Sequence, residues 1–182
     1  MINFLHIPKT GGRSIEELID GHDHIKYFGH RGKHIVPSPS FCIIRNPYDR
    51  LVSAYFYLLH QETENEPDKS YRELLMKYVS FKHFVMSIRD DRLDKAIIHL
   101  KPMSYFICDE NGEIAIDSIF KIEEIDKIGT YLQGIGIDKT LSDVWLNTSE
   151  HKHWQEYMNI KMIVEINEIY RMDFELFDYR MI

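Results

Sequence analysis

The sequence predicts an α/β fold, built as a single domain with a mainly parallel central sheet flanked by helices. Short apolar runs typical of buried strands alternate with longer segments of helical periodicity, as in parallel α/β proteins. A glycine-bearing turn at residues 9–12 joins the first apolar run directly to the first helical segment. The chain of 182 residues can bury one substantial core, which favours a single domain over residues 1–182.

The composition is typical of a soluble globular protein, with 44% hydrophobic and 28% charged residues. The net charge of −7 argues against nucleic acid as a partner, because nucleic acid usually requires a basic surface. Cys42 and Cys108 lie in apolar runs, so we expect buried thiols and a reducing compartment. The chain starts close to a strand and has no apolar run of membrane-spanning length. We therefore expect a cytoplasmic protein without a transmembrane segment.

The first element is a predicted strand at residues 4–7, which Pro8 ends. A turn at residues 9–12 follows, and a helix is predicted from Ser14 because Ile15, Leu18 and Ile19 repeat at helical spacing. The first N–H groups of a helix have no intrahelical partner, and the helix dipole favours an anion there. This arrangement predicts a cradle for a phosphate-like group.

The residue types in the turn suit an anion. Gly11 and Gly12 allow a tight turn and a close approach of the backbone, and Lys9 adds a positive charge. Thr10 and Ser14 offer hydroxyl donors. The lysine precedes the glycines, so the turn differs from the Walker A motif of nucleotide-binding proteins. The alternative interpretation is a plain connector between strand and helix.

The second strand of interest is the apolar run at residues 41–44, which has the composition of a central parallel strand. It ends at Arg45, and a helix is predicted from Pro47 with Asn46 as its N-cap. Lys9 and Arg45 each follow a predicted strand, so both are expected at the carboxyl edge of the sheet, where ligands of such folds bind.

The other elements follow from the same periodicities. In chain order they are a short strand at 25–28, an exposed loop at 29–40, a mobile loop at 62–70, two or three helices within 71–99, a strand at 104–108, a strand within 114–122, a helix at 123–132 and a final helix from about 160 to 172.

Arg45 and Ser53 form a second pair that could bind a phosphate group. The guanidinium can bind a phosphate through two donors, and Ser53 lies about two turns into the following helix. The alternative is that Arg45 pairs with Asp49 and that Ser53 is a small packing residue.

Taken together, the two stretches resemble the sulfotransferases that use 3′-phosphoadenosine 5′-phosphosulfate (PAPS). Residues 6–14, His-Ile-Pro-Lys-Thr-Gly-Gly-Arg-Ser, are similar to the family's 5′-phosphosulfate loop. Residues 45–55, Arg-Asn-Pro-Tyr-Asp-Arg-Leu-Val-Ser-Ala-Tyr, are similar to its 3′-phosphate motif. The two motifs are most similar to those of the carbohydrate branch, which includes the heparan and uronyl 2-O-sulfotransferases. The resemblance implies a P-loop-like sulfotransferase fold and transfer of a sulfuryl group from PAPS to a hydroxyl of a carbohydrate acceptor.

The resemblance also assigns residues to roles. It implies that the 5′-phosphosulfate is bound by Lys9, Thr10, Gly11, Gly12, Arg13 and Ser14. It also implies that Arg45 and Ser53 bind the 3′-phosphate. Lys9 is the implied catalytic cation. His30 resembles the glycine–histidine element that supplies the base, although Phe28 stands where relatives have another histidine. His34 is the alternative base, and a carboxylate base stays open.

Other interpretations remain at this point. A nucleotide-phosphate kinase would share the strand, loop and helix, but the Walker A spacing is missing. A binding module for an anion or nucleotide could keep the cradle without turnover. The chemistry requires no metal, and the four histidines at positions 22, 24, 30 and 34 lack an accompanying compact ligand set. His6 is interpreted as a structural residue of the first strand.

Overall fold

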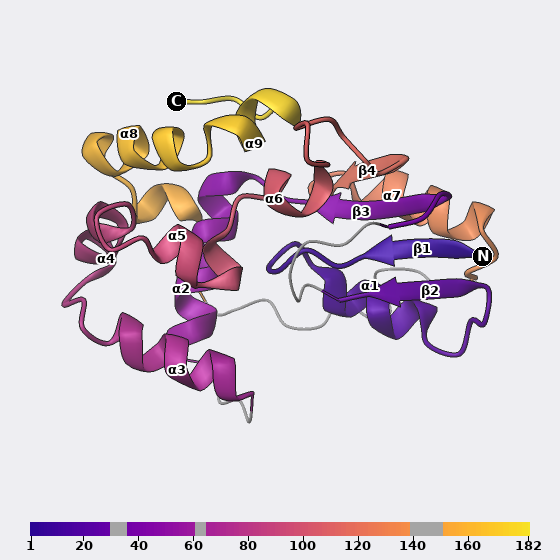
Figure 1. The fold of residues 1–182 in the computed structure, drawn as a ribbon, viewed down its shortest axis with the longest axis horizontal. Helices are drawn as coiled ribbons and strands as arrows, with labels where there is room; N and C mark the ends of the chain where they lie inside the picture. Colours follow the sequence, from indigo (N-terminus) through magenta and orange to yellow (C-terminus); the bar gives the residue numbers. More distant parts are fainter. Residues whose placement is uncertain (30–35, 61–64, 139–150) are drawn as a thin grey trace. The chain divides into compact units, whose positions relative to one another are not determined.

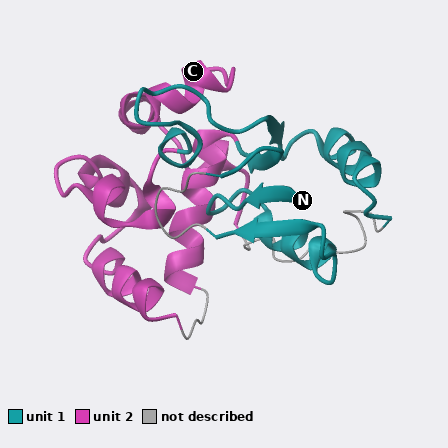
Figure 2. Cartoon of the chain, turned by 45° about the vertical axis from the view of Figure 1, so that its right-hand side comes forward, with its two compact units in different colours: residues 1–45, 103–148 teal, residues 46–102, 149–182 magenta. Residues whose placement is uncertain are grey.

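A computed structural model describes residues 1–29, 36–60, 65–138 and 151–182, and Figure 1 shows its helices and strands. The chain divides into two compact units, coloured separately in Figure 2. Unit 1 comprises residues 1–45 and 103–148, and unit 2 comprises residues 46–102 and 149–182. Each unit is described by itself below. His30 and His34, predicted as alternative bases, lie outside the described residues.

Unit 1 contains the sheet. Its elements are β1 (Ile2–Leu5), α1 (Gly12–Ile19), β2 (Ile25–Phe28), β3 (Ser40–Ile44), α6 (Ser104–Ile107), β4 (Ser118–Lys121) and α7 (Ile125–Gly134). The four strands pair in the order β2-β1-β3-β4, and every pairing is parallel. The predicted α/β fold with a parallel sheet is therefore confirmed.

The strand order places a topological switch point between two neighbouring strands of this sheet. From β1 the chain passes through α1 to β2 on one side, whereas β3 pairs with β1 on the other side. In open parallel sheets, ligands bind outside the carboxyl ends of the strands at the point where the strand order reverses. In this sheet that point lies between the ends of β1 and β3.

The core of unit 1 lies between one sheet face and two helices. Phe4 from β1 and Phe41 from β3 stack with ring centroids 4.9 Å apart on that face. The helices α1 and α7 cover these rings with their apolar stripes, through the buried residues Ile15, Leu18, Ile19, Ile128 and Leu132. This burial fixes α1, and so its first turn, against the strand that precedes it.

Unit 2 is helical. Its elements are α2 (Pro47–His60), α3 (Glu66–Leu75), α4 (Phe81–Ser87), α5 (Leu93–Ala96), the 3₁₀ helices η1 (Ile98–Leu100) and η3 (Trp154–Glu156), α8 (Ile160–Ile169) and α9 (Arg171–Leu176). Aromatic rings build much of its core. The Tyr48 ring stacks on Trp154 at 4.8 Å and contacts Phe174 at 5.0 Å between ring centroids.

The start of α2 agrees with its sequence. The side-chain oxygen of Asn46 accepts a hydrogen bond from the backbone N–H of Tyr48 at 3.0 Å, which is the bond of an N-cap. Pro47 is the first helical residue, where its missing N–H costs nothing.

Three predicted elements are wrong in detail. A loop was expected over 62–70, but residues 66–70 belong to α3, with Pro67 near its N-terminus. Residues 61–64 lie outside the described part. Residues 104–107 form the short helix α6 rather than a strand, and only Cys108 makes an isolated antiparallel bridge, with Ile114. The final helix breaks at Tyr170 into α8 and α9.

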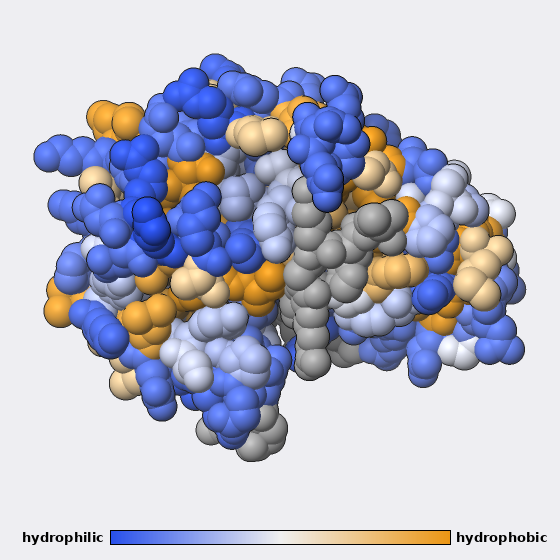
Figure 3. All heavy atoms as spheres, in the orientation of Figure 1, coloured by the Kyte–Doolittle hydropathy of each residue, from blue (hydrophilic) through white to orange (hydrophobic). Residues whose placement is uncertain are grey.

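Within the described residues, no helix is both long enough and apolar enough to cross a membrane. The face drawn in Figure 3 is mostly hydrophilic, and its apolar residues form several separate areas. Exposed apolar side chains such as Met76, Val79 and Ile160 are ordinary features of a protein surface.

Candidate anion-binding site

The loop between β1 and α1 has an unusual backbone. Lys9 has a φ of 68° and Gly11, the N-cap of α1, has a φ of 82°. A left-handed conformation is uncommon for lysine and is held only where the surroundings determine it. Turns of this kind direct successive N–H groups toward one concavity, which suits an anion. This backbone is consistent with the predicted anion cradle, which stays a prediction.

Thr10 braces this loop from inside. Its side chain is 1% exposed, and its Oγ1 donates a hydrogen bond to the carbonyl of Ile7 at 2.9 Å. Because the hydroxyl proton is used in the loop, any bond from Thr10 to an anion would come from its backbone N–H. Ser14 is also buried, and its N–H donates to the carbonyl of Gly11 at 3.2 Å.

The first turn of α1 follows directly. Gly12 and Arg13 open the helix, so their N–H groups have no acceptor within it. Gly12 is buried and the Arg13 side chain is exposed. A Cβ atom on Gly11 would come within 2.5 Å of the Cδ1 of Ile122, which follows β4. The positive φ and the nearby Ile122 side chain both favour glycine at position 11.

Arg45 reaches the same loop from the neighbouring strand. It follows β3 directly, and its Nη1 donates to the backbone carbonyl of Lys9 at 3.3 Å. The structure thus brings Lys9 and Arg45, two of the cations predicted at the site, to the carboxyl edge where β1 and β3 lie side by side.

The remaining predicted residues have different positions. Ser53 lies in α2 of unit 2, where its side chain is 2% exposed. Its expected partnership with Arg45, which belongs to unit 1, stays a prediction.

One residue at this edge was missed as a functional candidate. His6, the first residue after β1, is 6% exposed, and its Nδ1 lies 2.5 Å from the Oε1 of Glu16 in α1. The Tyr27 hydroxyl lies 3.2 Å from the same nitrogen. The sequence carries no clear signal for this pair, because the contact depends on the direction in which the His6 side chain leaves the end of β1.

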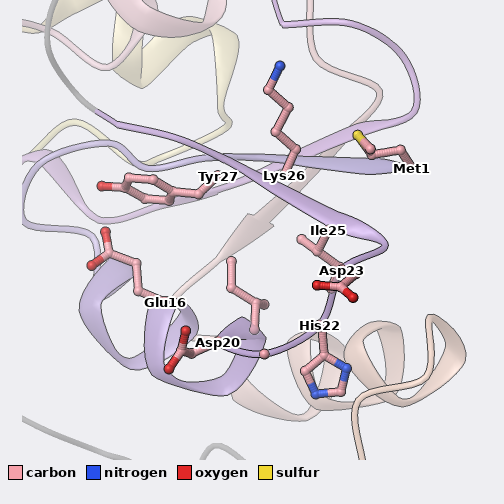
Figure 4. A pocket seen from close by; sticks show the side chains of 10 residues that line it. Met1, Glu16, Asp20, His22, Asp23, Ile25, Lys26 and Tyr27 are labelled. Carbon is pink, nitrogen blue, oxygen red and sulfur yellow. The ribbon is translucent and has the colours of Figure 1, made fainter.

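A cavity of about 740 Å³ lies beside this cluster and is drawn in Figure 4. Its lining includes the carboxylates of Glu16, Asp20 and Asp23, against the cationic Lys26 and the imidazole of His22. This excess of carboxylates is unfavourable for a phosphorylated donor, because like charges repel. The anion cradle at the start of α1 fits such a donor better.

In the described ranges, no three His, Cys, Asp or Glu side chains lie close enough together to hold a metal ion.

A comparison with known protein families matches residues 1–180 to a family described as the sulfotransferase family. No curated protein matches the chain.

Proposed function

Because this chain belongs to the sulfotransferase family, we propose that it moves a sulfuryl group from PAPS to a hydroxyl of an acceptor. The observation that carries the proposal is the cradle at the first turn of α1, with Lys9 beside it and Arg45 bonded to the loop. The positive charge of Lys9 and a row of backbone N–H groups suit the phosphosulfate end of such a donor.

The residues of the loop would divide the work. Lys9 would neutralise charge on the transferring group and on the leaving phosphate. The N–H groups of Gly11 to Ser14 would add fixed dipoles, and the exposed Arg13 would add a further charge at the rim. PAPS supplies the sulfuryl group, whose bond to the phosphate oxygen breaks as the acceptor oxygen bonds to sulfur, leaving 3′-phosphoadenosine 5′-phosphate (PAP).

The 3′-phosphate and the base rest on the sequence resemblance. Arg45 and Ser53 would bind the 3′-phosphate. His30 would accept the proton of the acceptor hydroxyl, with His34 as the alternative, because imidazole accepts protons near neutral pH. The proposed reaction uses no metal ion.

The acceptor is proposed to be a carbohydrate, because the two sequence motifs are most similar to those of the heparan and uronyl 2-O-sulfotransferases. The proposed compartment is the cytoplasm. Both cysteines, Cys42 and Cys108, are buried thiols, and burial raises the pKa of the Cys42 thiol, so neither demands an oxidising environment.

The proposal is tested by the release of PAP from PAPS in the presence of a panel of glycans. Lys9→Ala is expected to lower the rate by about 100-fold or more, the effect of removing one electrostatic stabiliser of a transition state. Lys127→Ala, at an exposed lysine of α7, is the matched control and should keep the wild-type rate. An unchanged rate in Lys9→Ala would remove the role given to this lysine.

The base is tested separately by comparing turnover with PAP affinity. His30→Ala should lower kcat strongly and leave PAP affinity near wild type, because a base acts on the acceptor. If only His34→Ala gives this pattern, His34 is the base. If neither does, the assignment of a histidine base is wrong.

A further inference from the structure

We propose that His6 and Glu16 form a positioning pair that sets the geometry of the 5′-phosphosulfate cradle. The proposal rests on the donor function proposed above. It goes beyond that function by adding two residues that the sequence analysis gave no role at the site.

The pair connects the strand to the first turn of the helix. His6 leaves the end of β1, and Glu16 lies one turn into α1, so their contact at 2.5 Å spans the loop that carries Lys9. The Tyr27 hydroxyl from β2 lies at the same nitrogen, at 3.2 Å. Figure 4 shows Glu16 and Tyr27 with their polar ends directed toward one another.

The contact determines the state of the His6 ring. A carboxylate only accepts hydrogen bonds, so an ionised Glu16 pairs with the His6 tautomer that carries its proton on Nδ1. The ring orientation is then fixed, and its Cδ2 and Nε2 face Gly12. An ideal Cβ on Gly12 would lie 2.1 Å from Cδ2 and 2.3 Å from Nε2.

The ring therefore occupies the space that any side chain at position 12 would need. The His6 side chain is 8% exposed, whereas that of Glu16 is 34% exposed, so the pair extends from the interior toward the surface. By contacting Gly12 and bonding Glu16, His6 touches two successive turns of one helix face. This contact holds the N–H groups of the first turn at a set distance from β1 and from Lys9.

The first experiment separates positioning of the cradle from general stability. Calorimetric titrations use PAP, which has both phosphates, and adenosine 3′-phosphate, which lacks the 5′-phosphate. Glu16→Gln is expected to weaken PAP binding about tenfold, as for the loss of a hydrogen bond to a charged group. It should leave the affinity for adenosine 3′-phosphate within about twofold. Glu17→Gln, at the exposed neighbouring glutamate, is the control and should change neither affinity.

A conservative change at the histidine provides a rescue. Like Glu16→Gln, His6→Ala should weaken the binding of PAP and leave the affinity for adenosine 3′-phosphate nearly unchanged. His6→Asn keeps an N–H donor on a short side chain and should recover part of the PAP affinity.

Each outcome decides a different point. If PAP binds to the wild type and Glu16→Gln weakens both nucleotides equally, the pair has a general structural role and the inference is wrong. If the wild type binds neither nucleotide, the donor function itself fails, and with it the premise of the inference.

A double-mutant cycle tests the contact with Gly12 directly. Gly12→Ala alone should weaken PAP binding by about tenfold or more, because the new methyl group meets the His6 ring. In the His6→Ala background the same methyl group has room, so the added loss should shrink to about twofold. Losses that multiply independently in the double variant would show that the two residues are not coupled.

Discussion

At the scale of the residue, the site depends on backbone conformations that most side chains avoid. Gly11 adopts a φ of 82° and approaches Ile122, and Lys9 adopts a φ of 68° without being glycine. The carbonyl of Lys9 accepts from Arg45, which helps to hold this unusual conformation. The left-handed conformation at Lys9 costs on the order of 1 kcal/mol, so the surrounding contacts must offset it.

Gly11 gives the clearest test of this account. Gly11→Ala is expected to lower the free energy of unfolding by about 1–2 kcal/mol, because alanine disfavours positive φ and its methyl group meets Ile122. Urea unfolding measures the change. The matched control is Gly129→Ala in α7, where a Cβ meets nothing within 4 Å and should stabilise the helix by about 0.5–1 kcal/mol. Equal effects at both positions would contradict the account.

Asp117 supplies a pH dependence at the opposite, amino end of the strands. Its carboxylate accepts from the N–H and the hydroxyl of Ser40, both at 2.7 Å, and from the Ser38 hydroxyl at 3.1 Å. These bonds lower the pKa of Asp117 below its ordinary value, mainly through Ser40. A lowered pKa in the folded state gives stability that is complete above the ordinary aspartate pKa of about 3.9 and is lost at lower pH.

Thermal unfolding as a function of pH checks this prediction. Asp117→Asn should melt below the wild type at neutral pH, and the two melting temperatures should converge as the pH falls below about 4. A difference that stays constant down to pH 2.5 would show that the ionised carboxylate is not the stabilising form.

At the scale of the element, α3 is anchored by a buried polar cluster. The Tyr57 hydroxyl of α2 donates to one oxygen of Asp68 at 2.8 Å, and the Nε2 of His99 lies 2.9 Å from the other. The Asp68 and His99 side chains are each 5% exposed. Because both oxygens of the buried Asp68 carboxylate have partners, the cluster ties α3 to α2 and η1 within unit 2.

Removing the charge tests this anchor. Asp68→Asn is expected to cost about 3 kcal/mol of unfolding free energy, since an amide can accept through only one of its two polar ends. Glu66→Gln, two residues earlier in an exposed pair with Lys69, should cost less than about 0.5 kcal/mol. Chemical denaturation of both variants decides between a buried anchor and an incidental contact.

The same cluster explains why one element was mispredicted. Residues 66–70 look like a solvated loop because they are polar, and the partners that bury Asp68 come from distant positions, Tyr57 and His99.

Residues 104–108 form a short apolar run, and periodicity cannot distinguish a short buried helix from a strand. In contrast, β3 and α2 were predicted well, because a continuous apolar run marks β3 and Asn46 marks the start of α2. The strand predicted at residues 4–7 exists as β1, but it spans Ile2–Leu5 and ends before Pro8.

The site divides in the same way. The cradle and the proximity of Lys9 and Arg45 could be predicted, because parallel strands place their carboxyl ends at one edge. The pairing of His6 with Glu16 could not, since it depends on the direction in which a side chain leaves a strand end. The hydrogen bond from the Thr10 hydroxyl to the carbonyl of Ile7 could not be predicted either, because it depends on the folded path of the loop.

At the scale of the whole molecule, the sequence passes between the two units at 45/46, 102/103 and 148/149, so neither unit is one continuous segment. The first passage separates Arg45 from Ser53, the two residues proposed for the 3′-phosphate. The proposed 3′-phosphate site is therefore tested on the complete chain.

The central claim is that this chain binds a nucleotide carrying both a 5′- and a 3′-phosphate. Calorimetric titration of the full chain with PAP, alongside ATP and AMP, tests it most directly. The account predicts tight binding of PAP, weak or undetectable binding of ATP and AMP, and a loss of PAP binding of about tenfold or more in Arg45→Ala. A preference for ATP, or an Arg45→Ala variant that binds PAP as well as the wild type does, would contradict the proposed donor site.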